Sequence, residues 1–169
     1  MRVDLTTEMI HALRVSPDLL LDFFVLFSRF EYALKAADFR QDAPNQADVS
    51  WDKFKNWLTQ LPTIEQTAVE NAGRYLIDNP PKKLVVLNGV SSWQVPGRGG
   101  QSGVRFLVEG LGRARNNLFH GGKWLTPPEL PERNFQVVST ALDVLRALVA
   151  LPSALNLRRH FEELPSSNA

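Results

Sequence analysis

Residues 115–120, Arg-Asn-Asn-Leu-Phe-His, contain two side chains that metal-free cleavage of a phosphodiester bond requires. The guanidinium of Arg115 is permanently charged and binds phosphate oxygens through a fork of N–H donors. The imidazole of His120 titrates near neutral pH and can accept or donate a proton. We expect Arg115 and His120 to form a phosphate-transfer site where the chain brings them together.

The spacing of these two side chains places a condition on the local backbone. On an ideal helix, five positions turn Arg115 and His120 about 140° apart, because each residue turns by ~100°. Gly121 and Gly122 follow at once, and glycine just past the last turn allows a helix to end there. The imidazole can then turn toward the arginine. Asn116, four residues before His120, can hydrogen-bond a ring nitrogen and fix its tautomer.

The surroundings of this segment are basic, although the formal net charge of the chain is only +1. Any affinity for a polyanion must therefore come from a local patch. Such a patch is typical of nucleic-acid binding, and its candidate RNA-binding cations are Arg98, Arg105, Arg113 and Lys123, with Glu109 as the single acid among them. A structural alternative stays open, because basic residues in a last helical turn followed by glycine also stabilise an ordinary helix end.

The composition predicts one intracellular domain. With 169 residues, of which 44% are hydrophobic, we expect a single domain over residues 1–165 and a frayed tail at 166–169. The absence of cysteine excludes disulfides, thiolate catalysis and cysteine-ligated zinc. His11 and His160 have no partners at ligand spacing, so we expect no metal site and no cofactor. Without a signal-peptide pattern or an apolar run of ~20 residues, we expect a cytoplasmic protein with no membrane partner.

Apolar periodicity predicts helices along most of the chain. Ser16, followed by proline, begins a helix to about residue 40; its first half is apolar nearly all round, which predicts the central helix. Ser50 caps a second helix. Thr63 and Gln66 form a capping-box pattern for a third helix, which we expect to run unbroken until just before the prolines at 80 and 81.

One region of the sequence is strand-like. Residues 83–95 alternate around an Asn-Gly pair at 88–89, which predicts a β-hairpin with a primed turn. Ser102 then caps the helix that leads into residues 115–120, and two further helical segments begin near residues 134 and 153. The predicted fold is all-α, a helical bundle of four to five main helices with a small β-hairpin insertion.

Glu31 and Lys35 lie four residues apart on the first long helix, and two interpretations of them stay open. They can form an ordinary i,i+4 ion pair worth a few tenths of a kcal/mol. Alternatively, Glu31 reaches the site and orients Arg115 or His120, because a charged pair on such an apolar helix needs a polar neighbour.

Residues 115–120 resemble the Arg-x(4–6)-His signature of the HEPN superfamily, including its usual polar residue directly after the arginine. Residues 30–35, Phe-Glu-Tyr-Ala-Leu-Lys, resemble the early-helix segment of a HEPN branch found on bacterial plasmids and genomes, and residues 121–123 suit that branch too. The resemblance implies a bundle of four to five helices that dimerises, with the two motifs facing each other. It also implies roles: His120 as the acid/base residue, Arg115 as the phosphate-binding residue and Asn116 as the orienting residue.

The function implied by the resemblance is that of a metal-independent endoribonuclease that leaves 2′,3′-cyclic phosphate and 5′-OH ends. Such a reaction needs two proton transfers, and the motif supplies one histidine per chain, so we expect the partner's copy to supply the second. A role as a toxin or a defence or stress component, held in check by an antitoxin or regulatory protein, would fit. The alternatives are a catalytically silent HEPN-like module that binds RNA or a partner protein, and a dimerisation protein whose basic helix end is only a cap.

Overall fold

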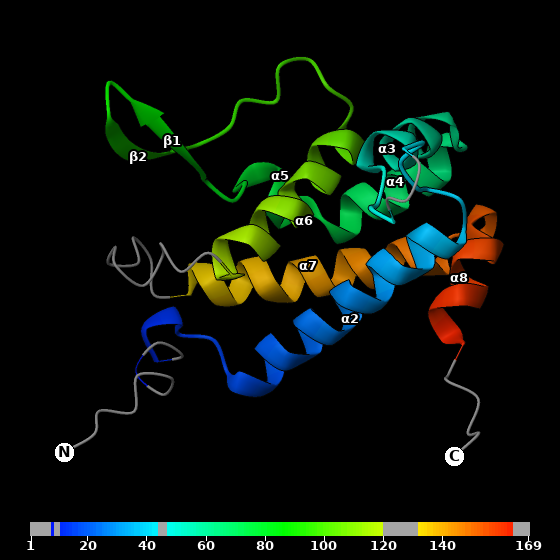
Figure 1. The fold of residues 1–169 in the computed structure, drawn as a ribbon, viewed down its shortest axis with the longest axis horizontal. Coiled ribbons are helices and arrows are strands. Elements are labelled where there is room, and N and C mark those ends of the chain that lie inside the picture. The colour runs from blue at the N-terminus through cyan, green and yellow to red at the C-terminus, as the bar shows by residue number, and fades with distance from the viewer. Residues whose placement is uncertain (1–7, 9–10, 44–46, 120–131, 164–169) are drawn as a thin grey trace.

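A computed structural model describes residues 8, 11–43, 47–119 and 132–163, and the structural statements below concern these residues. They are mostly helical, with one two-stranded antiparallel hairpin (Figure 1), which confirms the predicted all-α class with a hairpin insertion. In chain order the elements are α2 (Pro17–Ala36), α3 (Trp51–Gln60), α4 (Thr63–Ala72), α5 (Arg74–Asp78), β1 (Lys83–Leu87), β2 (Val90–Gln94), α6 (Gly103–Phe119), α7 (Arg133–Ala150), a 3₁₀ turn (Pro152–Ala154) and α8 (Leu155–Glu162).

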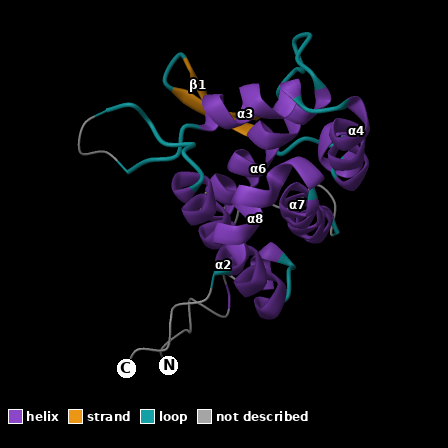
Figure 2. Cartoon of the chain, turned by 90° about the vertical axis from the view of Figure 1, so that its right-hand side faces the viewer, coloured by secondary structure: helices purple, strands orange, loops and turns teal. Residues whose placement is uncertain are grey.

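The central helix is α7, and the expectation that α2 would occupy this place was wrong. α7 packs against α2, α4, α5, α6 and α8, and Figure 1 shows it running between α2 and α6. α2 lies on the outside of the bundle (Figure 2) and keeps Leu21, Val25 and Tyr32 exposed, at 62%, 58% and 49%. A helix that is apolar nearly all round is therefore not necessarily buried on every side by its own chain.

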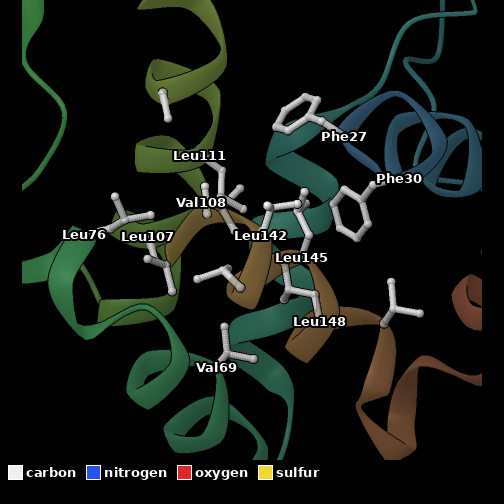
Figure 3. Close-up of a cluster of buried hydrophobic side chains, with 14 of the residues drawn as sticks. Phe27, Phe30, Val69, Leu76, Leu107, Val108, Leu111, Leu142, Leu145 and Leu148 are labelled. Atoms are coloured by element: carbon white, nitrogen blue, oxygen red, sulfur yellow. The ribbon is translucent and has the colours of Figure 1, made fainter. Parts of the chain in front are cut away.

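The core joins side chains from three helices. Phe27 and Phe30 of α2, Leu111 of α6 and Leu142 and Leu145 of α7 are each at most 2% exposed, and Figure 3 shows them in one cluster. Burying each such side chain contributes roughly 1.5–3 kcal/mol. This cluster fixes α2 and α6, which carry the candidate residues, relative to each other.

Two of the predicted helix caps are present and two are absent. The hydroxyl oxygens of Ser16 and Ser50 accept hydrogen bonds from the backbone N–H groups of the third residue beyond each, at 3.2 and 3.4 Å. The hydroxyl of Ser102 is buried with no hydrogen-bond partner among the described residues, and only its carbonyl accepts from the Phe106 N–H. Ser102 therefore does not cap α6 through its side chain.

The predicted capping box at Thr63 is also absent. Thr63 is the first residue of α4, Pro62 occupies the capping position, and α4 has no side-chain cap. The Gln66 amide instead donates to the carbonyl oxygens of Thr59 and Leu61, at 3.2 and 2.8 Å, where α3 ends. Gln66 therefore joins α3 to α4, because the open carbonyl groups at the end of α3 lie within its reach.

The third predicted helix is broken in two at Gly73. α4 ends at Ala72 and α5 begins at Arg74. A Cβ atom at Gly73 would lie 2.4 Å from the terminal methyl groups of Leu107, so only glycine allows α6 to approach this closely. The requirement for glycine at this break therefore comes from packing between distant segments, which apolar periodicity along the chain does not reveal.

The β-hairpin forms with the predicted turn. Asn88 and Gly89 have φ values of 51° and 79°, as a primed two-residue turn requires. The register pairs Leu84 with Trp93, so their side chains share one face of the hairpin. At its base, the Asn117 side chain of α6 donates a 2.9 Å hydrogen bond to the carbonyl oxygen of Lys82.

Among the described helices, none is by itself both long and apolar enough to cross a membrane. α7 and the segment Pro152–Glu162 meet these criteria of length and composition only when taken as one pair, which is bent by 77°.

Candidate functional site

Arg115, near the end of the described part of α6, is held by groups from two helices. Its Nη2 donates a 2.6 Å hydrogen bond to Oε1 of Glu31 in α2, and its Nη1 donates to Oδ1 of Asn116 at 2.9 Å. The guanidinium carbon lies 5.4 Å from the centre of the Phe27 ring. The Arg115 and Glu31 side chains are 31% and 26% exposed. The guanidinium is thus fixed in orientation while it remains accessible to solvent.

The position of Glu31 follows from the pattern of α2. Phe27 lies one turn before it on the same face, and Phe30, next to it, is fully buried. Packing of these two rings into the core brings the Glu31 carboxylate to the side of α6, where the guanidinium compensates its charge. Lys35 lies in the last turn of α2, where a cation favours the helix dipole. Two interpretations of Glu31 were open, and among the described side chains Glu31 makes the contact with Arg115 that the second interpretation expected.

Arg115 lines a cavity of about 770 Å³ between the hairpin and the helices α2, α3 and α6. Its polar lining is mostly cationic or amide-bearing and consists of Lys55, Lys83, Glu109, Arg113, Arg115, Asn116 and Asn117. Its apolar lining, which also includes Gly112, is rich in aromatic rings and consists of Phe27, Trp51, Leu84, Trp93 and Val108. A cavity with cationic and aromatic walls suits a ligand that is both anionic and planar.

One carboxylate lies between two of these cations. Oε1 of Glu109 is 3.4 Å from Nζ of Lys55, and Oε2 of Glu109 is 3.5 Å from Nη1 of Arg113. Both distances are longer than the 2.7–2.9 Å that is typical of charge-assisted hydrogen bonds, so both contacts are weak. Lys55 also contacts Asp52 at 2.9 Å, and the hydrogen bond and charge of Lys55 hold the pKa of Asp52 below its ordinary value.

Arg113 is a largely buried cation in the cavity wall. Its side chain is 18% exposed and its guanidinium lies 5.4 Å from the centre of the Phe106 ring. Burial lowers the pKa of Arg113, and the charge of Glu109 compensates this only in part. The Nε and Nη2 atoms are buried with no hydrogen-bond partner among the described residues. N–H groups left in this state destabilise the folded protein.

The structure brings together only some of the residues that the sequence indicated. Arg113, Arg115 and Asn116 line the cavity, and Glu31 contacts Arg115. The other two described members of the predicted basic patch do not line it. Arg98 donates to the carbonyl oxygen of Gln101 at 2.8 Å, and Arg105 donates to Oδ1 of Asn56.

Part of the predicted site lies outside the described residues. His120 and Lys123 belong to this part, as do the glycines at 121 and 122 and the tail at 166–169. The predicted hydrogen bond from Asn116 to the His120 ring therefore stays a prediction. Among the described residues, no group of three or more His, Asp or Glu side chains could hold a metal ion.

Sequence reasoning missed the sides of the cavity that α3 and the hairpin form. Lys55 and Trp51 of α3 and Lys83 and Trp93 of the hairpin are distant in sequence from Arg115. The Trp51 ring lies 6.0 Å from the Phe27 ring, centre to centre, and also borders the cavity. The alternation of side chains in the predicted hairpin shows on which face of the hairpin Trp93 lies. It does not show which other element that face packs against.

Comparisons of this chain with models of protein families, with curated proteins and with solved structures give no match.

Proposed function

We propose that this protein is a HEPN-type endoribonuclease that acts as a homodimer without a metal ion. The observation that carries the proposal is Arg115, which Glu31 and Asn116 hold in the wall of a cavity with other cations. A guanidinium whose orientation is fixed before the substrate binds can stabilise charge on a phosphate with little reorganisation. The resemblance of residues 115–120 to the HEPN motif supplies the reaction type.

In the proposed reaction, Arg115 binds the non-bridging oxygens of the scissile phosphate. One His120 imidazole accepts the proton of the ribose 2′-OH, and the 2′-oxygen forms its bond to phosphorus as the bond to the 5′-oxygen breaks. The His120 of the partner subunit, in its protonated form, gives its proton to the leaving 5′-oxygen. The products are a 2′,3′-cyclic phosphate and a 5′-OH, and no atoms or electrons are left over.

Glu31 acts in this scheme as a positioning residue. Its carboxylate accepts from Nη2 of Arg115, while Asn116 accepts from Nη1. These two bonds hold the guanidinium plane, and the Phe27 ring lies beside it. The side chain of an arginine loses much conformational freedom on binding a ligand, and a guanidinium that is already ordered loses less.

The exposed face of α2 supports the homodimer. Leu21, Val25 and Tyr32 are spaced by four and seven residues, so they form one stripe along the helix, and about half or more of each side chain is exposed. An apolar stripe of this kind is stabilised when a second surface covers it. Glu31, which contacts Arg115, is the neighbour of Tyr32 on this helix, so we propose that the second copy docks along α2.

RNA cleavage by three matched proteins tests this proposal. We expect the wild type to cut RNA in EDTA and to leave RNA with 2′-deoxyribose at the scissile position intact, since the 2′-oxygen is the nucleophile. His120→Ala and Arg115→Ala should lose the activity, whereas Arg146→Ala, which removes an exposed arginine of α7 outside the cavity, should retain it. Equal cleavage by all of these proteins, or cutting at the 2′-deoxy position, would refute the mechanism.

A catalytically silent HEPN-like module that binds RNA or a partner protein is the second candidate. The observation that favours it is that Lys55, Arg113 and Trp93 can bind a ligand in the cavity without any proton transfer. If the protein is a toxin or defence component, growth arrest of cells that express it distinguishes the nuclease from the binding module. Arrest by the wild type that His120→Ala abolishes favours the nuclease, and equal arrest by both proteins favours the binding module.

A further inference from the structure

We propose that the cavity is a nucleotide-binding subsite, in which a base stacks on Trp93 and the attached phosphate is held by Lys55 and Arg113. The ligand is one base joined to one phosphate, either as part of an RNA strand or as a free nucleotide. As a subsite for RNA, this inference rests on the proposed function. As a site for a free nucleotide, it does not.

The first observation is the aromatic wall beneath the hairpin. Trp93 is half-buried and faces the cavity together with Leu84, its cross-strand partner. Trp51, across the cavity, already packs against Phe27 and Phe54. Trp93, by contrast, has no ring of any described residue packed against it. An indole in this position offers a face on which a base of any sequence can stack.

The second observation is that Arg113 is weakly satisfied, and that Lys55, which pairs with Asp52 at 2.9 Å, makes only a long contact with Glu109. The contacts of Lys55 and Arg113 with Glu109 are 3.4 and 3.5 Å long, and Nε and Nη2 of Arg113 have no hydrogen-bond partner among the described residues. A phosphate can therefore draw the Arg113 guanidinium into the cavity without breaking a strong hydrogen bond. A phosphate also offers several acceptor oxygens at once, which suits a guanidinium better than one shared carboxylate.

The third observation is the size and continuity of the cavity. Its volume of about 770 Å³ lies within the range that is typical of small-molecule sites. Arg115 and Asn116 belong to the same wall. A nucleotide of an RNA strand that occupies the cavity would therefore have the neighbouring phosphate of the strand close to Arg115. Asn117 holds the base of the hairpin on α6 and so keeps Trp93 over the site.

Titration with nucleoside monophosphates, followed by calorimetry and tryptophan fluorescence, tests the subsite. We expect AMP, GMP, CMP or UMP to bind the wild type at least about tenfold more tightly than inorganic phosphate or the bare nucleoside, because both walls contribute. Trp93→Leu and Lys55→Gln should each weaken binding about fivefold or more. Lys53→Gln is the matched control, because Lys53 lies on the same helix, pairs with Asp42 and does not line the cavity.

A second titration identifies the source of the ligand and separates this inference from the proposed function. It uses Arg115→Ala protein and a 2′-deoxy trinucleotide that the proposed reaction cannot cut. Tighter binding of the trinucleotide than of any monophosphate, lost in Lys55→Gln, supports an RNA subsite. Binding of monophosphates alone supports a free-nucleotide site, and if the wild type also cuts no RNA, the proposed function is refuted.

Two outcomes would overturn the subsite. In the first, the wild type binds neither a monophosphate nor the trinucleotide. In the second, Trp93→Leu and Lys55→Gln bind as tightly as Lys53→Gln, which would place the ligand elsewhere. Either result can occur with RNA cleavage intact, so failure of the subsite is distinguishable from failure of the nuclease.

Discussion

Arg115 of α6 donates a 2.6 Å hydrogen bond to Glu31 of α2, 84 residues earlier in the chain. The two residues belong to the two segments, 30–35 and 115–120, that carry the resemblance to HEPN proteins. The bond is charge-assisted and about one quarter to one third of each side chain is exposed. A pair in this environment contributes little to stability, so its main consequence is the fixed orientation of the guanidinium.

Replacing Glu31 with glutamine should impair cleavage more than folding. The amide keeps the shape but loses the charge that holds the Arg115 guanidinium in place, so we expect kcat/KM for RNA to fall about tenfold or more. The free energy of unfolding should change by only about 0.2–1 kcal/mol, because the pair is partly exposed. Lys35→Gln, on the same helix, is the control: it should keep the kcat/KM of the wild type and lose at most about 1 kcal/mol of stability, the contribution of a cation to the helix dipole. An unchanged kcat/KM in Glu31→Gln would remove Glu31 from the site.

Arg113→Met should leave the protein as stable as the wild type, or more stable. Methionine keeps the length of the side chain and removes a desolvated guanidinium with two unpartnered nitrogen atoms. Replacing such a charge with an apolar group is often stabilising, here by up to about 1 kcal/mol in urea unfolding. Arg105→Met, which removes a half-buried arginine bonded to Asn56, is the control and should stay within about 0.5 kcal/mol of the wild type. A loss of more than about 2 kcal/mol in Arg113→Met would mean that Arg113 stabilises the fold.

The pair of Asp52 and Lys55 should make part of the stability dependent on acid pH. Lys55 holds the pKa of Asp52 below its ordinary value of 3.8 through a hydrogen bond and its charge. A carboxyl group with a depressed folded-state pKa stabilises the fold above 3.8, and this contribution is lost as the pH falls through the depressed pKa. Urea unfolding of the wild type and Asp52→Asn from neutral to strongly acid pH should therefore show a small difference in stability that disappears at the acid end. A difference that persists at the acid end would contradict this assignment.

Gly73→Ala should be destabilising, in contrast to Gly112→Ala. The new Cβ at position 73 would lie 2.4 Å from the methyl groups of Leu107, and overpacking of this kind costs about 1–3 kcal/mol. A Cβ at Gly112 would meet no atom within 4 Å, and alanine inside a helix is more favourable than glycine by about 0.5–1 kcal/mol. Measured by thermal unfolding, the Tm of Gly73→Ala should therefore be lower than that of the wild type, and the Tm of Gly112→Ala should be higher. A Tm for Gly73→Ala equal to that of the wild type would show that α4 and α6 can separate without loss.

Features that depend on neighbouring residues were predictable from the sequence. Ser16 and Ser50 cap their helices, and Asn88 and Gly89 form the hairpin turn, because each interaction spans only a few positions of the chain. The mostly helical class follows for the same reason, since apolar spacing reports the period of the backbone. The roles of residues 115–120 were also suggested by the sequence, and for His120 they stay a prediction.

Features that depend on which distant surfaces meet were decided only by the tertiary structure. α7 rather than α2 is central, and the helix break falls at Gly73, where Leu107 of α6 leaves no room for a Cβ atom. Glu31 contacts Arg115 because the rings of α2 fix it against α6, and Trp93 borders the same cavity because Asn117 holds the hairpin on α6. The sequence by itself determined which side chains could do chemistry. Long-range packing determined which of these side chains share a site. The reason is that apolar periodicity predicts which face of a helix or strand is buried, but not which other element packs against that face.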